Sequence, residues 1–132
     1  MITVIKLKKA YDPTAIITLA LECSAQFKLF HWQTFSFAQH EAFDKIGKDL
    51  AKSFDMLVET LLGRYREYEY KPLNLQLIPH SPENILEKIN QYLEVLSGKN
   101  CKILNPEDTD AQNIVEEIVA DLNKLKYLLT LE

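Results

Sequence analysis

Residues 37–67 read FAQHEAFDKIGKDLAKSFDMLVETLLGRYRE, a segment with the features of one long helix. Ser36 stands directly before it and Gln39 follows three residues later, which is the capping-box pattern of a helix start. Apolar side chains then recur every three or four residues, as an amphipathic helix requires: Phe43, Ile46, Leu50, Phe54, Leu57 and Leu61. The sequence therefore predicts a long helix over 37–67 with one apolar face that other elements must cover.

Three further helices are predicted, over 13–33, from 82 and from 106. Each begins at a capping residue followed by proline, a pair favoured at helix N-termini: Asp12-Pro13, Ser81-Pro82 and Asn105-Pro106. Gly98 is the expected stop of the third helix. Their apolar stripes are Ile16, Leu19, Ala20, Cys23, Phe27 and Phe30; Ile85, Ile89, Tyr92, Leu93 and Leu96; and Ile114, Ile118, Leu122, Leu125 and Leu129.

The connections predict how these helices are arranged. The first two helices and the last two are joined by short connections, which favours antiparallel neighbours. Residues 68–80 lack helical periodicity, carry Pro72 and Pro79, and can reach ~40 Å at ~3.3 Å per residue. That reach returns the chain along the whole bundle. The sequence therefore predicts a single all-α domain over 1–132, a ferritin-like up-down-down-up four-helix bundle with one long crossover.

The composition excludes several classes of protein. The chain has 132 residues, of which 47% are hydrophobic and 26% charged, so it is globular rather than disordered. A net charge of −4 argues against a nucleic-acid surface over the whole body. No apolar run approaches the ~20 residues that span a bilayer, so we expect no membrane partner. Two cysteines are too few for a disulfide framework, and we expect a reducing, cytoplasmic location.

Five side chains on the first two predicted helices are potential metal ligands: His31, His40, Asp44, Asp55 and Glu59. Imidazole and carboxylate together suit iron, zinc or manganese. At 3.6 residues per turn, the last four share one flank of the second helix, beside its apolar face. His31 ends the first helix, and the short connection brings it near the start of the second. We therefore expect His31, His40 and Asp44 to approach one another.

The other two carboxylates cannot join the same ion within one chain. Asp55 follows Asp44 by eleven residues, or ~16 Å along a helix axis, whereas metal–ligand bonds are ~2 Å. The ligands therefore form two half-sites, one with Asp44 and one with Asp55. The two half-sites meet only if two copies of this helix pack antiparallel about a two-fold axis near residues 49–50. Gly47 and Ala51 flank that midpoint and are small enough for close approach. The spacing predicts a homodimer with two sites shared between chains.

Two stretches, AQFKLFHW over 25–32 and FAQHEAFDKIGKDLAKSFDMLVETLLGR over 37–64, resemble the Dps-like miniferritins (DNA-binding proteins from starved cells) of the ferritin-like superfamily. In that family a His-Trp pair ends the first helix, and the second carries His-x3-Asp-x10-Asp-x3-Glu. The resemblance covers residues 20–65. The matching residues here are His31-Trp32, His40, Asp44, Asp55 and Glu59.

The resemblance implies an enzyme that oxidises Fe(II) with peroxide or dioxygen at ferroxidase sites between subunits. The implied metal ligands, which are also the catalytic residues, are His31, His40 and Asp44 of one chain and Asp55 and Glu59 of its partner. The ferric product would be stored in a hollow homo-oligomeric cage, dodecameric by resemblance, which detoxifies iron under oxidative stress. Zinc or manganese would be substitute ions at the same ligands.

Several alternatives stay open from the sequence. The segment between His31 and His40 is three residues shorter than the family pattern, so His31 is either a ligand or displaced. A structural or assembly bundle with a vestigial metal site is the second interpretation. A DNA-protecting protein without ferroxidase activity is the third, because Lys6, Lys8 and Lys9 form a small basic N-terminal segment whose DNA binding would be salt-sensitive.

Overall fold

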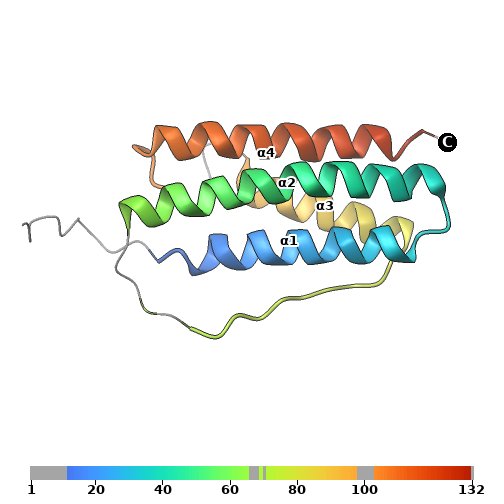
Figure 1. Cartoon of the computed structure of the whole chain (residues 1–132), viewed down its shortest axis with the longest axis horizontal. Helices are drawn as coiled ribbons and strands as arrows, with labels where there is room; N and C mark the ends of the chain where they lie inside the picture. Colours follow the sequence, from blue (N-terminus) through green and yellow to red (C-terminus); the bar gives the residue numbers. More distant parts are fainter. Residues whose placement is uncertain (1–11, 66–68, 70, 98–102, 132) are drawn as a thin grey trace, which may run out of the picture.

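A computed structural model describes residues 12–65, 69, 71–97 and 103–131. It contains four α-helices: α1 (Thr14–Gln33), α2 (Phe37–Arg64), α3 (Pro82–Leu96) and α4 (Thr109–Leu128). These described residues include no β-strand. In Figure 1, α1 and α4 run in one direction along the bundle, and α2 and α3 run in the opposite direction. The predicted fold class, an all-α four-helix bundle, is confirmed.

The four apolar stripes meet in one core. Phe27 and Phe30 of α1 pack their rings on Phe43 of α2, with centroids 5.9 and 5.5 Å apart. Each such fully buried side chain contributes roughly 1.5–3 kcal/mol of hydrophobic stabilisation. The buried stripe residues include Ile16, Cys23, Ile46, Leu50, Phe54, Leu57, Leu61, Ile85, Ile89, Tyr92, Leu96, Ile118, Leu122 and Leu125.

The two serine caps form as predicted. The hydroxyl of Ser36 accepts the backbone N–H of Gln39 (3.2 Å), and that of Ser81 accepts the backbone N–H of Asn84 (3.0 Å). A capping box also predicts that the Gln39 side chain accepts the backbone N–H of Ser36, and this part of the prediction is wrong. The backbone N–H of Ser36 donates to the hydroxyl of Thr34 (3.0 Å), and that hydroxyl donates to the Gln39 side chain (2.8 Å). Thr34 therefore stands between the two expected partners.

Several helix ends differ from the predicted ones. Pro13, and not Asp12, occupies the N-cap position of α1. The carboxylate of Asp12 still accepts the backbone N–H two residues further on (2.9 Å). The second helix ends at Arg64 rather than at 67, and the third ends at Leu96. The predicted stop at Gly98 lies outside the described residues.

The last helix begins at Thr109 rather than at Pro106. The reason is a turn closed by the backbone N–H of Asp108 and the carbonyl of Asn105 (3.0 Å). The carboxylate of Asp108 is buried, and it accepts the hydroxyl of Tyr65 at 2.7 Å. This long-range bond holds Asp108 inside the protein, and the helix begins only at the next residue.

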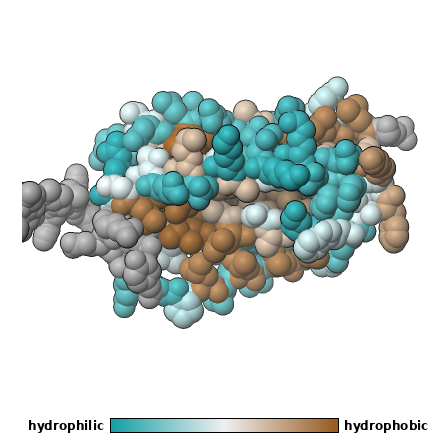
Figure 2. Space-filling model, in the orientation of Figure 1, coloured by the Kyte–Doolittle hydropathy of each residue, from teal (hydrophilic) through white to brown (hydrophobic). Residues whose placement is uncertain are grey.

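The segment 71–81 is extended and lies along α1 (Figure 1). Side chains of α1 bond to its backbone. The Glu22 carboxylate accepts the N–H of Gln76 (2.8 Å), while the Gln26 amide accepts the N–H of Ile78 (2.9 Å) and donates to its carbonyl (2.8 Å). Over this segment Figure 2 shows a brown apolar surface. Leu75 and Leu77 of the segment and Leu21 of α1 are exposed.

A buried ion pair ties this segment to α1 and α3. The Lys88 side chain is 3% exposed, and its Nζ donates to Glu22 (3.0 Å) and to the Gln76 carbonyl (2.5 Å). The Tyr92 hydroxyl donates to the same Glu22 oxygen (2.9 Å). Burial raises the pKa of Glu22, but the bonds from Gln76, Lys88 and Tyr92 outweigh burial and hold it below its ordinary value. The carboxylate is therefore charged and fully bonded inside the bundle.

Among the described helices, none combines the length and the apolar character that crossing a bilayer requires.

Candidate metal-binding site

His31 and His40 lie face to face where α1 ends and α2 begins. Their ring centroids are 3.9 Å apart and their planes differ by 20°. Nδ1 of His31 is 2.8 Å from the backbone carbonyl of His40, and Nδ1 of His40 is 3.1 Å from the backbone carbonyl of His31. Because a carbonyl only accepts, each Nδ1 carries the proton. In a neutral ring with its proton on Nδ1, Nε2 carries the lone pair that binds metals.

The short connection produces this arrangement. Thr34 caps α1 through its backbone N–H, which donates to the Phe30 carbonyl (3.0 Å). Its hydroxyl bonds to Gln39 on the first turn of α2. The His80 ring bonds to the same Gln39 oxygen (2.9 Å) and packs edge-on against Phe30. The segment that is shorter than the miniferritin pattern thus keeps His31 beside His40.

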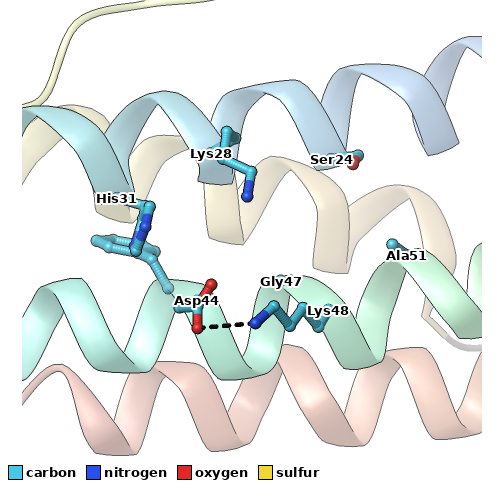
Figure 3. Close-up of a pocket in the computed structure, with 8 residues that line it drawn as sticks. Ser24, Lys28, His31, Asp44, Gly47, Lys48 and Ala51 are labelled. Carbon is cyan, nitrogen blue, oxygen red and sulfur yellow. Dashed lines mark hydrogen bonds and ion pairs between the residues drawn. The ribbon is translucent and has the colours of Figure 1, made fainter.

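Asp44 lies one helical turn after His40 and lines a small pocket between α1 and α2. Figure 3 shows His31 entering this pocket from α1 and Asp44 from α2. The pocket has a volume of about 100 Å³. Its lining residues are Ser24, Lys28, His31, Phe43, Asp44, Gly47, Lys48 and Ala51.

The Asp44 carboxylate has a cationic partner on its own helix. Nζ of Lys48 donates to its Oδ2 at 3.1 Å. This hydrogen bond is the main reason that the pKa of Asp44 is lowered, and the charges of Lys48, His31 and Lys28 act in the same direction against a smaller effect of burial. Asp44 is therefore ionised and able to accept a metal ion. The four-residue spacing of Asp44 and Lys48 is the sequence signal of this pairing.

Asp55 and Glu59 are exposed on α2, one turn apart. Within the described part of the chain, neither forms an ion pair, and no three His, Cys, Asp or Glu side chains are placed to hold one metal ion. The structure brings His31, His40 and Asp44 to one end of α2 and leaves Asp55 and Glu59 further along it. In one chain the predicted ligands therefore lie in two separate groups along α2, as their spacing in the sequence requires.

The fold is that of a four-helix-bundle protein that carries two groups of polar residues along α2. Residues 31–129, which include all five predicted ligands, match DUF5856, a family of unknown function, and the chain belongs to that family. It is also similar to an uncharacterized 14.6 kDa protein in the mobD–ri intergenic region of Enterobacteria phage T4. The two are 29% identical over 114 residues, which cover 86% of this chain and 84% of the phage protein. No solved structure matches the chain.

Proposed function

We propose that this protein is a miniferritin-like ferroxidase, which binds Fe(II) at two sites shared by antiparallel copies and oxidises it. The observation that carries the proposal is the histidine pair. His31 and His40 hold each other through Nδ1, so the Nε2 atoms of the neutral rings are left to bind a metal, and Asp44, one turn after His40, is ionised. Two imidazoles and a carboxylate suit Fe(II), and zinc or manganese would bind as substitutes.

The register of α2 supports a second copy as the source of the remaining ligands. A two-fold axis between residues 49 and 50 places His40 opposite Glu59 of the second copy. The same axis places Asp44 opposite Asp55 of that copy. Two independent ligand pairs therefore share one midpoint. Gly47 and Ala51 lie beside this midpoint, and both are accessible on the surface of α2.

The proposed ligands suit an iron ion whose positive charge increases on oxidation. Three carboxylates per site offset the charge that grows as Fe(II) becomes Fe(III). Two Fe(II) ions give up one electron each to peroxide, whose O–O bond breaks and which takes up two protons to leave two waters. The histidines must be neutral to bind, so affinity falls at acid pH. A homo-oligomer of such dimers would store the ferric product.

A role in assembly with a vestigial metal site is the second candidate, and a surface feature favours it. Three aromatic residues at the α1–α2 connection are exposed: Trp32 by 70%, Phe35 by 105% and Phe37 by 66%. Clustered exposed aromatic side chains mark interaction surfaces. DNA protection depends on Lys6, Lys8 and Lys9, which lie outside the described residues.

Aerobic oxidation of Fe(II) tests the proposed function. We expect Asp55→Ala and Glu59→Ala each to slow oxidation at least about tenfold, because even partners of metal ligands contribute 10–100-fold to affinity or activity. Both side chains are exposed, so the helical content and the oligomer measured by native mass should persist. Glu87→Ala removes an exposed carboxylate from α3 and is the matched control. Equal rates in all four proteins would favour the assembly role.

His31→Ala tests whether the shortened connection has kept this ligand. The variant loses one Nε2 ligand atom and also the ring that stacks on His40, so Co(II) affinity should fall about 10–100-fold. Glu87→Ala, which removes an exposed carboxylate from α3, is again the control. Isothermal titration with Co(II) measures both variants. Unchanged affinity in His31→Ala would remove His31 from the ligand set.

A further inference from the structure

The ion pair between Asp44 and Lys48 lies within the proposed half-site (Figure 3). The Lys48 side chain is 72% exposed, and its Nζ lies 3.1 Å from the Asp44 carboxylate. A second pair with the same spacing, Lys45 and Asp49, lies on α2 at 3.5 Å. Of these two lysines, only Lys48 lines the pocket. The ammonium group of Lys48 therefore lies beside the Asp44 carboxylate, where a metal ion would have to bind.

When a shared site holds no metal ion, its carboxylates repel one another. It gathers Asp44 of one chain with Asp55 and Glu59 of the second copy. Two like charges 4 Å apart repel by about 1 kcal/mol in water and about 4 kcal/mol near a protein surface. Three facing carboxylates would hold the two copies apart unless a cation lies among them.

Lys48 is placed to be that cation. The proposed two-fold axis sets Lys48 opposite Ala51 of the second copy, one helical turn from Asp55 of that copy. The small side chain of Ala51 leaves room for the lysine stem. Lys28 also lines the pocket, but its Nζ lies over the Trp32 ring at 6.0 Å, and its effect on Asp44 is through charge alone.

We propose that Lys48 is the built-in counter-cation of the empty site, which holds Asp44 and Asp55 of the second copy together until a divalent ion displaces its ammonium group. This inference rests on the proposed function. The long, rotatable lysine stem lets the ammonium group swing into solvent when the ion arrives. Lys48 thus stabilises the metal-free dimer and competes with the metal, which sets the metal concentration at which the site fills.

Lys48→Met tests this role, because methionine keeps a long apolar stem and removes the charge. We expect two changes of opposite sign. The metal-free dimer should dissociate about two- to fivefold more readily, and Co(II) should bind about two- to fivefold more tightly, the range of an exposed ion pair. Sedimentation of the metal-free protein measures the first change. Titration with Co(II), at protein concentrations where both proteins are dimeric, measures the second.

Lys45→Met is the matched control, since Lys45 forms the equivalent pair with Asp49 away from the pocket. It should leave both quantities unchanged. If wild type binds Co(II) and Lys48→Met binds it equally or more weakly, the role of Lys48 is wrong and the proposed function stands. If wild type neither dimerises nor binds Co(II), the proposed function fails, and the role of Lys48 fails with it.

Discussion

Replacement of Lys88 by Met is expected to lower the free energy of unfolding by about 3–5 kcal/mol, the cost of leaving one charge of a buried pair without its partner. Glu22 would remain ionised inside the bundle with one donor fewer. The Gln76 carbonyl would also lose its ammonium donor, so the extended segment would be held less firmly against α1 and α3. Urea denaturation followed by circular dichroism measures the loss.

Two comparisons isolate the buried charge. Lys126→Met removes a partly exposed lysine that donates to Asn90 on α3 (3.1 Å), and it should cost less than about 1 kcal/mol. The double variant Glu22→Leu/Lys88→Met removes both charges and should recover part of the loss. If Lys88→Met is as stable as the wild type, the ion pair between Lys88 and Glu22 does not hold the segment 71–81 in place.

The contribution of Glu22 to folding stability depends on pH with a defined sign. In the wild type, the folded-state pKa of Glu22 lies below its ordinary value of 4.5, so its contribution to stability is present above pH 4.5 and is lost as the pH falls through the folded-state pKa. Without Lys88, burial raises the pKa of Glu22. The deficit of Lys88→Met should therefore shrink at acid pH, where Glu22 takes up a proton.

Gly47→Leu is expected to dissociate the dimer and abolish metal binding together. A Cβ at position 47 would lie 4.0 Å from the Cβ of Phe27, an ordinary contact, so the single chain tolerates a side chain there. The rest of the leucine would fill part of the pocket that Gly47 lines, on the face where the proposed second copy must approach. Overpacking costs about 1–3 kcal/mol per contact, and the two-fold axis applies it twice. The dimer should weaken by at least about thirtyfold.

Gly63→Leu is the matched control, because a Cβ at Gly63 meets nothing within 4 Å and the residue lies far from the proposed axis on the same helix. It should leave the dimer and metal binding intact. Sedimentation and Co(II) titration on one preparation measure both properties. A dissociated Gly47→Leu that still binds Co(II), or a dimeric one that does not, would contradict the shared site.

The helical bundle could be predicted because its signals are local. Ser36 and Ser81 cap helices within four residues of sequence, and the apolar stripes follow from 3.6 residues per turn. The same periodicity places His40, Asp44, Asp55 and Glu59 on one flank of α2. Their distances apart along the helix are set by sequence separation alone. The separation of these residues into two groups along the helix was therefore predictable without any tertiary contact.

Tertiary contacts determine which polar groups are buried and how the two histidine rings are oriented. Glu22 and Lys88 stand 66 residues apart in two amphipathic helices, and neither position differs in pattern from a solvated one. The tautomers of His31 and His40 follow from bonds to each other's backbone across the turn. Such bonds depend on the angle and depth at which two helices dock, which packing of the whole core determines.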